Sequence, residues 1–369
     1  MFIDLRTIRI LSAIAAVVSI APIQASDGQL EINQACAVNT GCFTGDAPGF
    51  PVTITQPGSY RLTGNLDLST VSADLHGVEV SAPAVTLDLG GFQVIGPSGC
   101  TGSGASINCA PAGAGHGVHA LDTASGFTVR NGTVRNMGFI GIFTLAAGSR
   151  VENITTFHNR WDGITGDKHA TVLNCNAFEN GSDGIDVNSG SVVDATTATD
   201  NGKHGILARG VNIVVTRTTA QGNGQDGINV PIGGAVIDTV TASGNTGDGI
   251  EANGDGSLVR GSNARGNAGA GFNLVAAHTK YRDNVSTANG NSDTCGGGIC
   301  TELRRFYAAV DNTCDSGFRV VTRPFELMDP GSLIYDGGRA DANTSLYPSA
   351  GGIGYRSAYE PAASIDKIC

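Results

Sequence analysis

Along the middle of the chain, a glycine followed by an apolar residue recurs at intervals of 21, 22 or 24 residues. Between these pairs lie small, β-branched and polar residues, as in residues 191–196, and then a turn of the Asn-Gly type. No unit has room for a helix of ordinary length, so the pattern predicts several short strands per unit. The repeated pairs are Gly117-Val118, Gly141-Ile142, Gly163-Ile164, Gly184-Ile185, Gly205-Ile206, Gly227-Ile228, Gly249-Ile250 and Gly271-Phe272.

A unit of about 22 residues with short strands cannot bury its apolar side alone, but stacked units bury it continuously. The sequence therefore predicts an all-β fold, a parallel β-helix in which matching strands pair coil on coil at about 4.8 Å. Alternation along a strand places Ile185 and Val187 inside the coil and Asp186 on its outer side. The regular leucine framework of leucine-rich repeats, which have a similar period, is missing.

Residues 85–96 and the coils headed by Gly-Ile resemble the right-handed parallel β-helix proteins of the pectin-lyase-like superfamily. The resemblance covers roughly residues 50–293. It implies right-handed coiling. Members of that superfamily include pectate lyases, polygalacturonases, alginate lyases and epimerases, and secreted solenoids of unassigned activity, so the resemblance does not choose a reaction.

The N-terminal segment, residues 1–25, combines Arg6 and Arg9 with an apolar run and ends in a small residue, as cleaved secretory signals do. The run is shorter than the roughly 20 residues that a membrane span needs. We therefore expect a signal peptide, a secreted or periplasmic protein and no membrane span. With 22 basic against 33 acidic residues, a net charge of −11 and no basic cluster, a nucleic acid is not expected as a partner.

The remaining boundaries follow from where the period fails. Residues 26–70 are expected to form an N-terminal capping segment, 71–293 the solenoid with an inserted loop at 97–115, and 294–369 a C-terminal disulfide-rich cap. In an exported chain nine cysteines suggest disulfides. Cys175 is expected to remain a buried, unreactive thiol. Proximity along the chain suggests the pairs Cys36–Cys42, Cys100–Cys109, Cys295–Cys300 and Cys314–Cys369.

Because the period is nearly constant, positions at equal offset from each glycine should stack into columns on the surface. The position before the glycine is occupied by His76, His116, Asp162, Asp183, His204, Asp226, Asp248 and Ala270. The outward position two residues after the glycine is occupied by Glu79, His119, Phe143, Thr165, Asp186, Leu207, Asn229, Glu251 and Asn273.

The first column contains candidate catalytic carboxylates. Backbones on adjacent coils lie about 5 Å apart and those two coils apart about 10 Å, which approximate the two carboxylate spacings of retaining and inverting glycosidases. Asp183 with Asp162 fits the shorter spacing, and Asp183 with Asp226 the longer, with His204 on the coil between them. Repulsion between stacked carboxylates raises the pKa of one, which makes it a candidate general acid.

Asp183 and His204 precede glycines on successive coils, with Asp162 one coil earlier. This arrangement partly resembles polygalacturonases, which carry acidic residues on successive coils and then a Gly-His-Gly coil. Ser182 and Lys203 depart from the polygalacturonase pattern, and the later Arg-x-Lys is absent. The Asp-Pro-His signature of alginate epimerases is also missing.

A structural interpretation competes with the catalytic one. An Asp before Gly is a good corner residue, since its side chain caps the turn and the glycine accepts a positive φ. No cofactor is required by the pattern, although a calcium ion bound by Asp162, Asp167, Asp183 and Asp186 is compatible with it. A lyase or epimerase would need a base and a cation for the uronate, and the nearby suppliers are His119, His169, Lys168 and Arg209.

We therefore expect a carbohydrate-active protein whose partner is an extended polysaccharide, cleaved by hydrolysis or by a lyase-type reaction. The expected catalytic residues are Asp162, Asp183, His204 and Asp226, and the expected substrate-binding residues are Trp161, His119, Asp186 and Arg209. The alternative is a non-catalytic solenoid that binds a polysaccharide or a surface. Oligomeric state is not predicted.

Overall fold

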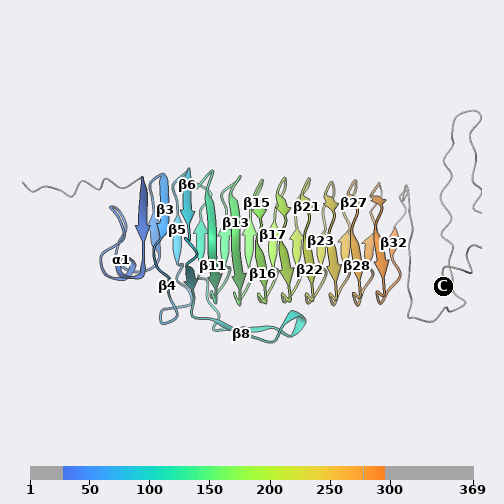
Figure 1. The fold of residues 1–369 in the computed structure, drawn as a ribbon, viewed down its shortest axis with the longest axis horizontal. Helices are drawn as coiled ribbons and strands as arrows, with labels where there is room; N and C mark the ends of the chain where they lie inside the picture. Colours follow the sequence, from blue (N-terminus) through green and yellow to red (C-terminus); the bar gives the residue numbers. More distant parts are fainter. Residues whose placement is uncertain (1–27, 277, 296–369) are drawn as a thin grey trace, which may run out of the picture.

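The computed structural model describes residues 28–295 except residue 277 (Figure 1). These residues form one elongated stack of coils, each built from short strands joined by tight corners. No helix within them is long and apolar enough to cross a membrane. The expected signal peptide, and the expected C-terminal cap after residue 295 with its cysteine pairs, lie outside the described residues.

One face of the solenoid is an eleven-stranded sheet whose strands all pair in parallel, coil on coil. Each of its strands from the second onward begins at the apolar residue of a Gly-apolar pair, except the last. The strands are β2 (Val52–Ile54), β5 (Val78–Val80), β10 (Val118–Ala120), β12 (Ile142–Thr144), β14 (Ile164–Gly166), β17 (Ile185–Val187), β20 (Ile206–Ala208), β23 (Ile228–Val230), β26 (Ile250–Ala252), β29 (Phe272–Leu274) and β32 (Thr294–Cys295).

The other strands of the coils form a nineteen-stranded parallel sheet, in which most coils contribute two short strands. They are β1 (Gln29–Ile32), β3 (Gly58–Leu62), β4 (Leu66–Asp67), β6 (Val85–Asp88), β7 (Gln93–Ile95), β11 (Thr128–Arg135), β13 (Arg150–Phe157), β15 (Thr171–Leu173), β16 (Asn176–Phe178), β18 (Val192–Asp194), β19 (Thr197–Thr199), β21 (Val214–Thr216), β22 (Thr219–Gln221), β24 (Val236–Asp238), β25 (Thr241–Ser243), β27 (Leu258–Arg260), β28 (Asn263–Arg265), β30 (Lys280–Arg282) and β31 (Val285–Thr287).

Inside the solenoid, like residues stack on like residues. Ile164, Ile185 and Ile206 occupy matching positions on β14, β17 and β20 and are fully buried. The glycine before each of them is needed for close approach: a Cβ on Gly184 would lie 2.6 Å from Asn201 Nδ2 and 2.7 Å from the Gly205 carbonyl oxygen. The expectation of a positive φ at these glycines is wrong, because neither Gly184 nor its equivalents on the neighbouring coils have one.

Buried asparagines at the next corner form a continuous hydrogen-bonded ladder. Asn180 Nδ2 donates to Asn201 Oδ1 (3.0 Å), and Asn201 Nδ2 donates to Asn223 Oδ1 (3.1 Å). From Asn180 onward, each Oδ1 also accepts the backbone N–H of the asparagine on the preceding coil, as Asn201 Oδ1 does from Asn180 N (3.0 Å). The ladder thus satisfies backbone groups that the turns would otherwise leave unpaired in the interior. It runs through Asn159, Asn180, Asn201, Asn223, Asn245, Asn267 and Asn289.

The coils begin within residues 26–70, since β2, β3 and β4 already pair with the next coil. A short helix, α1 (Gln34–Asn39), lies beside them and is joined to its following loop by the Cys36–Cys42 disulfide. Cys175 is free and buried in the core, where burial raises the pKa of its thiol to about 12. The thiol is therefore protonated and unreactive at neutral pH, which confirms the expectation for this residue.

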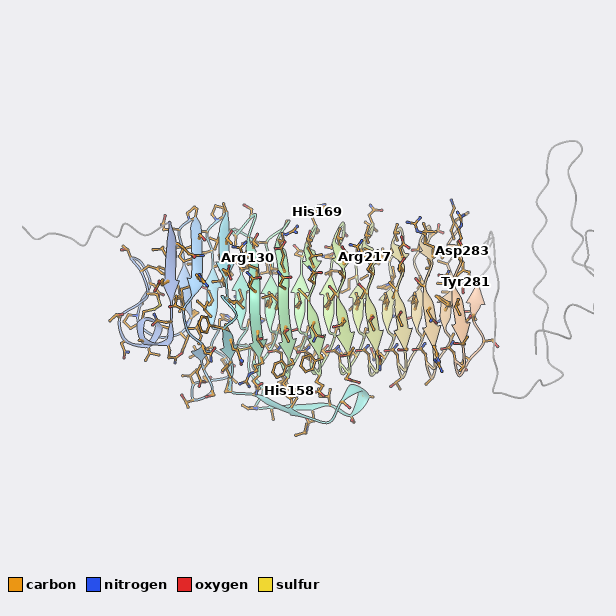
Figure 2. All side chains as sticks on the ribbon, viewed as in Figure 1. Arg130, His158, His169, Arg217, Tyr281 and Asp283 are labelled. Atoms are coloured by element: carbon orange, nitrogen blue, oxygen red, sulfur yellow. A yellow bond between two sulfur atoms is a disulfide. The ribbon has the colours of Figure 1, made fainter. Side chains whose placement is uncertain are left out.

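The inserted loop forms an antiparallel hairpin of β8 (Gly99–Thr101) and β9 (Asn108–Ala110), with a short 3-10 turn at Gly104–Ser106 and the Cys100–Cys109 disulfide. It runs along one edge of the solenoid beneath several coils (Figure 1). Figure 2 places His158 at this edge and His169 at the opposite one. Gly104 N donates to the Asp200 carbonyl oxygen at 2.9 Å. A Cβ on Gly202 would lie 2.8 Å from Ile107, so the hairpin packs directly on this turn.

Candidate functional site

The corner before the eleven-stranded sheet carries a second ladder, which we call the acceptor ladder. Asp162 Oδ1 accepts the backbone N–H of Asp183 (3.0 Å), and Asp183 Oδ1 accepts that of His204 (2.9 Å). His204 Nδ1 accepts the N–H of Asp226 at 3.3 Å. Asp and His are equivalent here because each offers one acceptor atom at the same place. The side chain therefore has a structural role, as the competing interpretation predicts, but it caps the turn of the following coil and not its own. The acceptors are His76, Asp162, Asp183, His204, Asp226 and Asp248.

The outward column also forms as the sequence predicts. Thr165, Asp186 and Leu207 are register partners on β14, β17 and β20. Asp186 lies on the outer side of its strand, yet it is only 3% exposed, because Arg209 and the acceptor ladder lie beside it. The outer face of the sheet is therefore not a flat solvated surface at this coil.

A pocket of about 370 Å³ opens on this face between the acceptor ladder and the outward column. Three carboxylates, Asp162, Asp183 and Asp186, line it, and Trp161, Lys203 and Arg209 contribute the surrounding groups. One oxygen from each of the three carboxylates lies within 4.8 Å of the others. The structure thus brings together five of the eight expected site residues. His204, Asp226 and His119 do not line the pocket.

The three carboxylates differ in which oxygens are already engaged. Asp162 accepts at both oxygens, from Asp183 N and from the Thr165 hydroxyl (3.0 Å). Asp183 uses Oδ1 for the acceptor ladder, and among the described residues its Oδ2 has no hydrogen-bond donor. Asp186 Oδ2 lies 2.5 Å from the Arg209 guanidinium. Asp186 Oδ1 is buried and has no hydrogen-bond partner among the described residues. Asp183 Oδ2 and Asp186 Oδ1 are therefore the carboxylate oxygens of the pocket that carry no hydrogen bond from the described residues, and Asp186 Oδ1 is buried.

Burial and mutual repulsion favour retention of a proton by this group. Burial, assisted by the charge of Asp183, raises the pKa of Asp162 to about 6. Burial raises the pKa of Asp186 to about 7, even though Arg209 opposes the shift. Burial also raises the pKa of Asp183, which is opposed by its hydrogen bond from His204 N and by the nearby charges of His204, Lys203 and Arg209. The carboxylates titrate as a coupled set that holds a proton near neutral pH.

The aromatic side of the pocket is built from two coils. Trp161 is 37% exposed and stacks on Phe139, with ring centroids 5.6 Å apart. Lys203 Nζ lies 4.7 Å from the centre of the Trp161 ring. A cation and an aromatic surface thus lie at the mouth of an acidic pocket, a combination that suits a sugar ring with polar substituents.

The fit of the three carboxylates to a calcium ion is poor. Calcium takes six to eight oxygen ligands, whereas Arg209 already occupies one oxygen of Asp186 and protein donors occupy both oxygens of Asp162. Asp167, the fourth expected ligand, instead accepts a hydrogen bond from Asn188 at 3.0 Å. Proton retention is the simpler way for these groups to relieve their repulsion.

The other expected site residues have different surroundings. Asp226 Oδ1 accepts from Asp248 N (2.7 Å) and its Oδ2 accepts from Asn229 (2.8 Å), so both its oxygens are engaged. His204 Nδ1 lies 3.3 Å from Asp226 Oδ2 as well as from its backbone nitrogen. His119 lies nearer the N-terminus, stacked on Phe143 with centroids 5.4 Å apart.

The sequence predicts Asp186 as a substrate-binding residue and, in the calcium alternative, as a neighbour of Asp162 and Asp183, but it does not predict the burial of this side chain. The signal was present: Asp186 follows Asp183 by three residues and so lies on the same coil across a single glycine corner. Lys203, treated as a departure from a known pattern, lines the pocket.

Comparisons with known proteins agree with this architecture. A family model described as the right handed beta helix region matches residues 91–212 and 164–323, together more than half of the chain. No curated protein matches the sequence.

Solved structures with a similar fold include two A-modules of mannuronan C-5 epimerases from Azotobacter vinelandii. The AlgE6 A-module is 15% identical, with 73% of this chain and 86% of that chain covered and a TM-score of 0.48. The AlgE4 A-module is 18% identical, with 70% and 74% covered and a TM-score of 0.47.

A third similar structure is pectate lyase Pel9A, which is 17% identical, with 82% of this chain and 89% of that chain covered and a TM-score of 0.49. Identities this low concern the fold alone, and no residue role is transferred from these proteins. The match of the family model over most of the coils, together with the observed parallel stack, shows that the chain belongs to the family of the right handed beta helix region.

Proposed function

We propose that the pocket hydrolyses glycosidic bonds in an extended polysaccharide that lies across the coils. The observation that carries the proposal is the convergence of Asp162, Asp183 and Asp186 in one pocket with their pKa values raised. Glycoside hydrolysis needs one carboxylic acid that is protonated and one carboxylate that is ionised, held close together. The same pocket supplies an exposed aromatic ring for the sugar.

The two free oxygens suggest the division of roles. Asp186, with its pKa raised to about 7, is the general acid, and its Oδ1, which is buried in this structure, becomes exposed by rotation of the side chain to donate a proton to the leaving glycosidic oxygen. The nearby charges of His204, Lys203 and Arg209 lower the pKa of Asp183 against the effect of burial, so Asp183 acts as the ionised carboxylate through Oδ2, either on the anomeric carbon or on a water molecule. Asp162 touches neither reacting atom and raises the pKa of Asp186 by its charge.

The first experiment is a screen of the purified protein against neutral and uronic polysaccharides, with and without calcium. New reducing ends and the absorbance of unsaturated products should be followed together. We expect new reducing ends without unsaturation, independent of calcium. Unsaturated products would contradict hydrolysis and indicate a lyase reaction. Binding without any product would favour the non-catalytic solenoid.

Asp183→Asn is the decisive variant, since asparagine keeps the ladder acceptor Oδ1 and loses only the charge and proton chemistry. We expect its kcat to fall by about 10²- to 10⁴-fold with an unchanged melting temperature. Asp248→Asn is the matched control, because Asp248 holds the same ladder position outside the pocket and accepts from Ala270 N. Equal losses in the two variants would refute the assignment.

A further inference from the structure

A second cluster of chemically active side chains lies on the same sheet, nearer the N-terminus. Glu79 on β5 and His119 on β10 are register partners, and His76 precedes Glu79 by three residues. Glu79 Oε2 lies 3.5 Å from His119 Nδ1 and 3.9 Å from His76 Nε2. All three ligand atoms lie within 4.8 Å of one another. The proposed hydrolytic role does not use any of them.

The histidines of this cluster are left with unsatisfied nitrogen atoms. Both ring nitrogens of His119 are buried without a hydrogen-bond partner among the described residues. The Nδ1 atom of His116, a residue that is 6% exposed, is in the same condition, and its ring centroid lies 4.9 Å from that of His119. Buried polar atoms without partners are rare in native proteins, so each needs an explanation.

We propose that His76, Glu79 and His119 bind a divalent transition-metal ion, with zinc as the best fit, and that solvent completes the coordination. Imidazole nitrogens and one carboxylate are ligands that Zn²⁺ prefers, at about 2.0–2.2 Å. In a tetrahedral site such bonds place neighbouring ligand atoms about 3.4 Å apart. The two measured distances to Glu79 Oε2, 3.5 and 3.9 Å, are close to that value before any ion is bound.

The cluster is partly exposed at His76 and Glu79 and lacks a competing cation. The side chains of His76 and Glu79 are 22% and 28% exposed, and that of His119 is 13% exposed. In residues 28–295, the ion pairs of Glu79 involve these two histidines and no lysine or arginine. The single negative charge and two neutral nitrogens thus remain available to one cation.

Binding requires one local change. His76 Nδ1 now accepts the backbone N–H of His116 at 3.0 Å, which places the proton of the neutral ring on Nε2. A metal at Nε2 moves that proton to Nδ1, so this hydrogen bond of the acceptor ladder is exchanged for a metal–nitrogen bond. The ring or the adjacent turn must shift slightly to separate the two N–H groups.

The test is titration of the full chain with Co²⁺, followed by its visible absorption, and with Zn²⁺, followed by calorimetry. We expect one ion per chain and a cobalt spectrum of nitrogen and oxygen ligands. Glu79→Gln and His119→Gln should each weaken binding by at least about tenfold. Circular dichroism and thermal melting check that both variants are folded.

The matched controls are His158→Gln and Glu179→Gln, which remove a His–Glu pair of 2.8 Å that lies outside the cluster. They should leave metal binding unchanged. A thiolate-to-cobalt band would place the metal on cysteines, and loss of binding in Asp183→Asn would place it in the acidic pocket. Either of these two results would overturn the proposal. Equal metal binding by all variants, or no metal binding by the wild type, would also overturn it.

Discussion

Individual carboxylates in the acceptor ladder serve two purposes with two oxygens. Asp183 gives Oδ1 to the backbone of the next coil and keeps Oδ2 for the pocket. The fold therefore fixes the position of the side chain without consuming its reactive atom. This division explains why the structural interpretation of the column and the catalytic one are compatible for the same residue.

A pH-dependent effect on stability should follow from Asp162. Its pKa rises from 3.8 to about 6 on folding, so the native state binds the proton more tightly. This contribution is present below about pH 4 and is lost as the pH rises through 6. Asp162→Asn cannot ionise and so lacks this pH dependence. We expect the free energy of unfolding of the variant, relative to that of the wild type, to be about 2–3 kcal/mol higher at pH 8 than at pH 4.

Chemical unfolding of both proteins at the two pH values measures this double difference. A difference that stays constant between pH 4 and pH 8 would show that Asp162 is not held protonated by burial.

Arg209 should set the pH range of activity. Its charge lowers the pKa of Asp183 and Asp186 against the effect of burial. Arg209→Met should therefore shift both limbs of the pH–rate profile to higher pH, by about one unit. Arg217→Met is the control, because Arg217 forms a comparable ion pair with Asp194 outside the pocket (Figure 2 labels Arg217). An unshifted profile in the Arg209 variant would contradict this account.

At the scale of the strand and corner, the asparagine ladder replaces the hydrogen bonds that water would otherwise supply. The Asn201 side chain takes part in four of these bonds, as acceptor twice from Asn180 and as donor to the Ala177 carbonyl oxygen and to Asn223. All of these groups are buried. Removing one member therefore exposes several polar groups to an apolar interior.

Asn201→Ala should destabilise the protein by about 2–4 kcal/mol, because it leaves buried donors and acceptors unpaired. Asn263→Ala is the control, since Asn263 is exposed on β28 and its backbone φ is not positive. Its effect should stay within about 0.5 kcal/mol. Urea unfolding of the two variants measures the difference, and similar losses would show that the ladder does not carry special weight.

The coils could be predicted from the sequence because each one repeats the same solution to the same packing problem. Gly184-Ile185 and its equivalents mark strand starts, and constant spacing places Asp162 beside Asp183. The burial of Asp186 and the conformation of Gly184 could not be predicted in this way. They depend on Arg209 and Asn201 from the following coil, and such contacts between side chains leave no periodic signal.

The whole molecule is acidic, with a net charge of −11, while its pocket holds Lys203 and Arg209. The net negative charge of the protein therefore repels an anionic polysaccharide at long range, while Lys203 and Arg209 attract it within the pocket. Salt screens the long-range part first, since the Debye length shortens from about 30 Å at 0.01 M to about 8 Å at 0.15 M.

The KM for a polyuronate should consequently fall by about two- to fivefold between these ionic strengths. The KM for a neutral polysaccharide of similar length should not change. Steady-state assays of both substrates at constant pH provide the measurement. A KM for the polyuronate that rises with salt would mean that local attraction by Lys203 and Arg209 outweighs the repulsion.

The acceptor ladder has a consequence for how this surface can acquire new chemistry. Aspartate, asparagine and histidine codons are interconverted by changes at the first base alone. All three residues present an acceptor that the next coil can use, as Asp183 and His204 do. A single-nucleotide substitution can therefore exchange an acid, an amide or an imidazole at a ladder corner while the turn keeps its hydrogen bond. The solenoid is in this sense a scaffold whose reactive groups mutate at little cost to folding.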